Sequence, residues 1–145
     1  MTLCREMKYQ RIMFIAGEAS GDALAAELVK ELREQLSGEN TSPEFFGAGG
    51  PKMVAAGVEL AMDMTGHAVI GLGDVLRNYA KFRRIFHDLL TLAVLEKPDL
   101  IVLVDFSGFN RRFAKAIREK IRKDKIAGWT PKIVQFVSPQ VWASR

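Results

Sequence analysis

The sequence predicts an α/β domain in three layers: a Rossmann-like parallel sheet covered by helices on both faces. Two observations indicate this fold. Apolar runs of strand length alternate along the chain with longer amphipathic segments of helical spacing. These runs are continuously apolar, which is typical of strands buried on both faces. Strands alternating with helices imply right-handed crossovers, for which we expect the strand order 3-2-1-4-5.

The first strand and the helix after it carry the clearest pattern. Arg11–Ala16 is a compact apolar run that ends at a glycine, so it predicts a buried strand. Four leucines then recur at every fourth position and predict an amphipathic helix: Leu24, Leu28, Leu32 and Leu36. We expect Ser20 or Asp22 to cap this helix and Gly38 to stop it.

The remaining elements are indicated by the same criteria. In chain order they are a strand at Glu44–Ala48, a short helix at Pro51–Ala56 closed by Gly57, a strand at Val58–Met62, a helix from about Asp74 to Glu96, a strand at Leu100–Asp105, a helix at Arg111–Lys125 and a strand at Ile133–Val137. With the order 3-2-1-4-5, the first and fourth strands are neighbours. The loops that follow them then flank the point where open α/β sheets bind ligands.

Composition excludes several classes of protein. The net charge is +4, and 48% of the residues are apolar, as in ordinary globular domains. Cys4 is the single cysteine, and His67 and His87 lie far apart, so we expect neither a disulfide nor a metal site. No apolar stretch is long enough for a signal peptide or a membrane span. We expect a cytoplasmic protein in a reducing compartment.

Two loops are candidates for chemistry. In Gly17–Asp22, two glycines let a ligand approach the backbone, and a helix start offers free N–H groups. The alternative is a tight turn with ordinary capping. Asp105 stands at the carboxyl end of the predicted strand Leu100–Asp105, where a carboxylate can serve as a general base if its surroundings strengthen it. The alternative is that Asp105 caps the next helix.

A third candidate region combines basic and apolar side chains. Four basic residues and no acid lie between Arg77 and Arg84, and bulky apolar residues recur at helical spacing. This combination suits an anionic membrane surface or an amphiphilic substrate. The residues expected to contact such a surface or substrate are Val75, Leu76, Tyr79, Phe82, Arg77, Lys81 and Arg83. The alternative is a core-facing helix with a solvated basic side.

The ordered motifs resemble those of the lipid-A-disaccharide synthases. They are Ala16-Gly17-Glu18-Ala19-Ser20-Gly21-Asp22, Gly47-Ala48-Gly49-Gly50-Pro51-Lys52-Met53, Ala68-Val69-Ile70-Gly71 with Asp74-Val75-Leu76, Pro98-Asp99, Asp105 with Phe109-Asn110, and Val137-Ser138-Pro139 with Val141-Trp142-Ala143. Three departures occur. Gly108 stands where the family has a second acid, Ser144 replaces a tryptophan, and Gly66-His67 replaces an acid-rich stretch.

The resemblance implies a two-domain GT-B glycosyltransferase. Such an enzyme transfers 2,3-diacylglucosamine from its UDP conjugate to 2,3-diacylglucosamine 1-phosphate and releases UDP. It needs no cofactor or metal, binds no nucleic acid, and lies peripherally on the inner face of the cytoplasmic membrane, with a homo-oligomer possible at full length. Residues 1–145 would form the amino-terminal, acceptor-side domain. The nucleotide-sugar domain would be absent from this chain, so we expect the chain alone to be inactive.

The resemblance also implies roles for single residues. Asp105 matches the essential aspartate and is expected to act as the catalytic base. The residues expected to contact substrate are Glu18, Ser20, Gly17, Gly21, Asn110 and Ser138.

Two alternative functions remain: a non-catalytic ligand-binding or receiver-like module, and another nucleotide-binding α/β enzyme. A receiver would carry an acidic pair after its first strand, where Glu18 supplies one acid. The second rival gives no reason for the basic and apolar helix.

Overall fold

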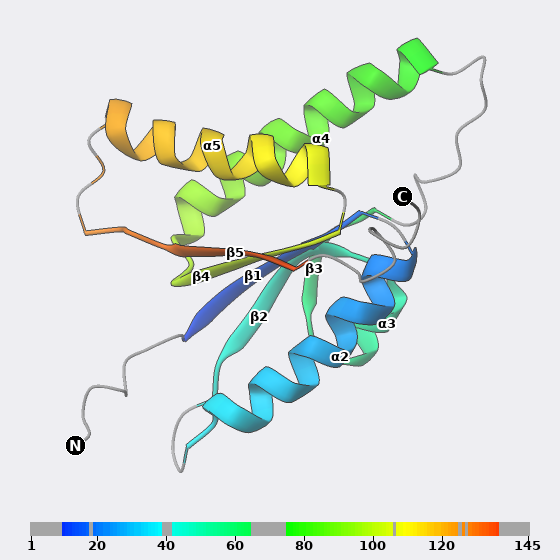
Figure 1. The fold of residues 1–145 in the computed structure, drawn as a ribbon, viewed down its shortest axis with the longest axis vertical. Coiled ribbons are helices and arrows are strands. Elements are labelled where there is room, and N and C mark those ends of the chain that lie inside the picture. The colour runs from blue at the N-terminus through cyan, green and yellow to red at the C-terminus, as the bar shows by residue number, and fades with distance from the viewer. Residues whose placement is uncertain are drawn as a thin grey trace, which may run out of the picture.

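Five parallel strands in the order β3-β2-β1-β4-β5 form the centre of the computed structural model (Figure 1). It describes residues 10–17, 19–38, 42–64, 75–105, 107–124, 126 and 128–136. The elements are β1 (Arg11–Ala16), α2 (Ala19–Leu36), β2 (Glu44–Gly49), α3 (Pro51–Ala55), β3 (Glu59–Asp63), α4 (Val75–Glu96), β4 (Leu100–Val104), α5 (Ser107–Asp124) and β5 (Lys132–Phe136). The predicted fold class and strand order are confirmed.

Helices cover both faces of the sheet and divide the core in two. Helices α2 and α3 lie on one face, and α4 and α5 lie on the other (Figure 1). Alternate residues of β1 point to opposite layers: Phe14 packs with α2 and α3, while Met13 and Ile15 pack with α4 and α5. All residues of β4 are buried as well. The continuous apolar runs therefore reflect burial on both faces.

Two features of the helices differ from the prediction. Helix α5 begins at Ser107, four residues before the predicted Arg111, because the prediction rested on the cationic residues from Arg111 onward, which do not mark the first turn of the helix. In α2 the predicted leucine repeat is only partly buried, and the residues with no exposure are Ala25 and Val29. Small side chains on the inner line let α2 approach the sheet closely.

The predicted cap of α2 is wrong. Helix α2 already begins at Ala19, so Ser20 and Asp22 both lie inside it. The Asp22 carboxylate is 2% exposed, and it accepts hydrogen bonds from the backbone N–H groups of Gly50, Lys52 and Met53 at 2.9–3.0 Å. These groups open α3, whose N-cap residue Gly50 has no capping side chain. Asp22 thus caps a different helix and joins the first loop to the second glycine motif.

A glycine in that second motif is required by close packing. Gly47 has a φ of 144°, and a Cβ built on it would lie 1.9 Å from the carbonyl oxygen of Phe14 in β1. The pairing of β2 with β3 shifts register between Gly47 and Ala48, as at a β-bulge. The glycine therefore has a structural reason that is independent of any ligand.

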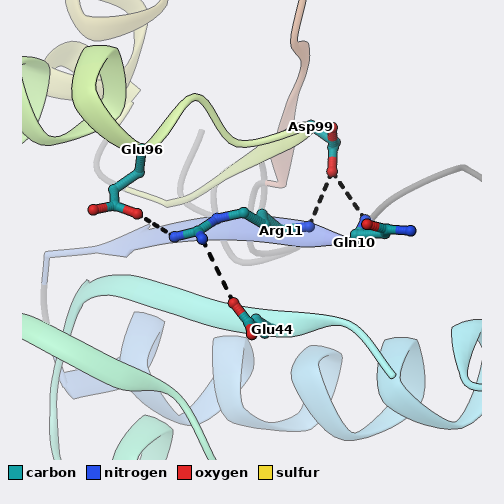
Figure 2. A network of polar contacts seen from close by, with 5 residues as sticks. All are labelled: Gln10, Arg11, Glu44, Glu96 and Asp99. Carbon is teal, nitrogen blue, oxygen red and sulfur yellow. Dashed lines mark hydrogen bonds and ion pairs between the residues drawn. The ribbon is translucent and has the colours of Figure 1, made fainter. Parts of the chain in front are cut away.

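The amino-terminal edge of the sheet is held by a polar network (Figure 2). The Asp99 carboxylate accepts hydrogen bonds from the backbone N–H groups of Gln10 and Arg11, both at 3.0 Å. The Arg11 guanidinium pairs with Glu96 and lies 3.6 Å from Glu44, so it links β1 to the end of α4 and to β2. The Pro98-Asp99 motif therefore fixes the start of β4 against β1, at the edge opposite the candidate site.

Removing the Asp99 carboxylate should destabilise this edge. Asp99→Ala leaves two backbone donors without their acceptor, and partial solvent access limits the cost to about 1–2 kcal/mol of unfolding free energy. Urea denaturation of the 145-residue chain measures it. Asp124→Ala is the matched control, since that carboxylate is 51% exposed and forms a surface pair with Lys120, and we expect it to cost less than about 0.5 kcal/mol. Equal effects of the two substitutions would contradict the role of Asp99.

Candidate active site at the carboxyl edge of the sheet

Strands β1 and β4 end side by side, and both chemical candidates follow them directly. Ala16 pairs with Val104 in the parallel register, so Gly17 and Asp105 leave the sheet as neighbours. From β1 the sheet continues to β2 on one side and to β4 on the other. This is the topological switch point at which open α/β sheets bind ligands. The predicted meeting of the first and fourth loops is confirmed.

The first turn of α2 forms one wall beside this point. Gly17 is buried and Ser20 is exposed. A Cβ on Gly21 would lie 3.5 Å from the Cβ of Ala16 and 3.7 Å from the carbonyl oxygen of Val104, which is ordinary van der Waals contact. The start of α2 therefore rests on the strand end that leads into Asp105. Glu18 lies outside the described residues.

Asp105 occupies a strained backbone position. Its φ is 50°, in the left-handed region, which costs a non-glycine residue about 1–2 kcal/mol. Its side chain is half-buried, and its backbone N–H donates to the carbonyl oxygen of Phe136 at the end of β5 at 2.8 Å. Such strain persists only where the surrounding structure enforces it, and it is common at functional sites. The chain enters α5 two residues later.

Asn110 lies behind Asp105 on the inner face of α5. It is completely buried, and its side-chain Nδ2 donates a hydrogen bond to the main-chain carbonyl oxygen of Asp105. Its Oδ1 is buried and has no hydrogen-bond partner among the described residues. The contact that the structure gives Asn110 is thus to the backbone of the candidate base, and its predicted contact with substrate stays a prediction.

The structure describes only some of the other residues that were predicted to contact substrate or membrane. Ser138 lies outside the described residues, as do the side chains of Val75, Leu76, Arg77, Tyr79 and Phe82. Lys81 and Arg83 are exposed on α4. Across the described part of the chain, no helix combines the length and the apolarity needed to cross a bilayer.

Helix α4 also carries a basic hollow. Of the residues that line it, Arg83 alone was among the predicted contact residues. The hollow has a volume of about 420 Å³ and is lined by Ala80, Arg83, Arg84, His87 and Asp88. Arg84 belongs to the basic run in the sequence, but His87 lies beyond the run and has no signal of its own. Its position one turn after Arg83 places the two on one side of the helix.

Comparison with known proteins assigns the family. The sequence profile described as lipid-A-disaccharide synthetase matches residues 12–145. The chain belongs to this family. It is 41% identical over 133 residues to lipid-A-disaccharide synthase 1 of Legionella pneumophila strain Lens, which covers 92% of this chain and 32% of that protein. It is 41% identical over 135 residues to the lipid-A-disaccharide synthase of Geobacter sulfurreducens, covering 93% of this chain and 32% of that protein.

The synthase of Trichlorobacter lovleyi is 37% identical over 136 residues, covering 94% of this chain and 32% of that protein. The chain therefore spans about a third of the length of these lipid-A-disaccharide synthases.

The structure gives two of the motifs that carried the resemblance a structural explanation. Asp22 caps α3 and Gly47 packs on β1, while Asp105 lies at the switch point with its backbone held in a strained conformation.

Proposed function

We propose that the protein is a lipid-A-disaccharide synthase that transfers 2,3-diacylglucosamine from UDP to 2,3-diacylglucosamine 1-phosphate. Membership of the family over residues 12–145 supports the activity. The single observation that carries the site is the position of Asp105 at the end of β4, beside the end of β1. Carboxyl ends of strands at a switch point are where α/β enzymes bind their substrates.

Asp105 would act as the general base. Its carboxylate accepts the proton of the acceptor's 6-hydroxyl group as that oxygen attacks the anomeric carbon of the donor. The bond from that carbon to the UDP oxygen breaks, UDP leaves with the electron pair, and the configuration at the carbon is inverted. Half-burial of Asp105 supports this role, because a base shielded from water transfers protons in a fixed geometry.

This chain would supply the acceptor side of the cleft, and the rest of the enzyme would bind the UDP-sugar. The support is the length of the relatives, of which this chain spans 32%. The test is to incubate the full-length protein with both substrates and to follow UDP release and disaccharide formation by mass spectrometry. We expect product from the full-length protein and none from residues 1–145 alone. Product from the isolated chain would contradict the division of the site.

We further propose that α4 brings the protein to the cytoplasmic face of an anionic membrane, where its diacyl substrates reside. Arg83 and Arg84 line the hollow on α4, beside His87 and Asp88, and each arginine near such a surface contributes about 1 kcal/mol. Peripheral attachment of this kind weakens with salt.

Vesicle sedimentation tests the membrane contact. With phosphatidylglycerol vesicles at low salt, Arg83→Ala combined with Arg84→Ala should weaken binding about 30-fold, the equivalent of about 2 kcal/mol. Lys115→Ala combined with Arg118→Ala is the matched control, because it removes the same charge from exposed residues of α5. We expect this control to bind like the unmodified protein. Absence of binding at low salt, or equal loss in both variants, would contradict the assignment to α4.

A further inference from the structure

The buried side chain of Asn110 has no structural need for its amide. Asn110 lies on the face of α5 that also carries Phe113 and Ile117, and all three residues have 0% exposure. An apolar residue would fill this place without the desolvation that a buried amide requires. The amide Oδ1 accepts no hydrogen bond among the described residues, so only the Nδ2 group recovers part of that loss. Its acceptor is the main-chain oxygen of Asp105.

Asp105 is therefore held at both of its backbone polar groups. Its N–H donates to Phe136 at the end of β5, and its carbonyl oxygen accepts from Asn110 on α5. The two bonds fix the peptide planes on either side of the Cα atom. With φ at 50°, Asp105 could otherwise relax toward the ordinary helical or extended regions, which would turn its side chain in another direction.

We propose that Asn110 is a positioning residue that holds the Asp105 carboxylate in its reactive direction. Its donor fixes the left-handed backbone of Asp105, so that in this role Asn110 acts through Asp105. This inference rests on the proposed role of Asp105 as the base. It predicts that the amide of Asn110 matters for turnover more than for folding or for substrate binding.

Asn110→Leu separates these effects in the full-length protein, because leucine has a similar shape and no donor. We expect kcat to fall roughly 10- to 100-fold, as for a misplaced reacting group, while KM for both substrates changes less than about threefold. The Tm should stay near that of the unmodified protein, since removal of the buried, unpaired Oδ1 offsets the loss of the Nδ2 hydrogen bond. Ile117→Val, on the same buried face, is the control that should leave kcat unchanged.

Two further variants keep the test decisive. Asn110→Asp retains size and polarity but replaces the donor with an acceptor. If the leucine variant does not fold, the aspartate variant provides the test, and its kcat should fall at least as strongly. A kcat within twofold of the unmodified enzyme in either folded variant would overturn the proposal. Asp105→Asn distinguishes a failure of the positioning role of Asn110 from a failure of the base role of Asp105. If it is inactive while the Asn110 variants are fully active, the positioning role fails alone; if it is active, the base assignment fails.

Hydrogen exchange gives a readout besides activity. The Asp105 amide, bonded to Phe136, should exchange about tenfold faster in Asn110→Leu, because the left-handed conformation is no longer held at the carbonyl. The amide of Met13 in the middle of β1 should be unaffected. Unchanged exchange at Asp105 would overturn the positioning role whatever the activity measurements show.

Discussion

Replacing Asp105 with asparagine is expected to lower kcat for sugar transfer by about 10²- to 10⁴-fold, the usual contribution of a general base. Asparagine tolerates left-handed backbone almost as well as aspartate, so the φ of 50° should survive and only the basic oxygen is lost. Alanine would be a poorer test, because it would also strain the turn. Steady-state UDP release by the full-length protein, with both substrates saturating, measures the effect.

Asp124→Asn is the control for this loss of charge. That carboxylate lies at the end of α5, is half exposed and pairs with Lys120, so its replacement should leave kcat within about twofold of the unmodified enzyme. Circular dichroism should show both variants folded. Turnover by Asp105→Asn close to that of the control would contradict the base assignment.

Replacing Asp22 with alanine is expected to destabilise the chain by about 3 kcal/mol or more, since it leaves buried backbone donors without an acceptor. The N–H groups of Gly50 and Lys52 lose their acceptor, while that of Met53 retains its bond to the carbonyl oxygen of Gly50. Because Asp22 is 98% shielded, water cannot readily replace the carboxylate. Asp22→Asn should cost less, because one acceptor oxygen remains. Urea denaturation of the 145-residue chain measures both substitutions.

Ser20→Ala, two residues earlier in the same turn of α2, is the matched control. Ser20 is exposed, so we expect a change below about 0.5 kcal/mol. If Asp22→Ala destabilised the chain no more than Ser20→Ala, the cap on α3 would have no energetic role, and the first loop would need another explanation for its aspartate.

The sheet could be predicted from the sequence because burial on both faces leaves a direct pattern. The runs Ile12–Ala16 and Leu100–Val104 are continuously apolar, and their bounds agree with β1 and β4 to within a residue. The role of Asp22 could not be predicted, because its partners lie 28 to 31 residues away. Local reasoning assigned it to its own helix, where an aspartate near the start is a common cap.

The candidate site shows the same limit. That Gly17 and Asp105 meet follows from strand order alone, which an alternating pattern of strands and helices restricts strongly. The left-handed backbone of Asp105 and its bond from Asn110 depend on where α5 begins, and charge patterning placed that start four residues too late. A single buried amide produces no periodic pattern in a sequence, so its hydrogen-bond partner can be identified only from the structure.

Binding of the acceptor at the carboxyl edge is the central claim, and an NMR titration tests it most directly. The ¹⁵N-labelled chain would be titrated with a short-chain 2,3-diacylglucosamine 1-phosphate that stays in solution. We predict that amide shift changes concentrate at Gly17, Gly21 and Asp105, while Gln10 and Asp99 at the opposite edge stay unchanged. Shift changes confined to that opposite edge, or none at millimolar acceptor, would contradict the account.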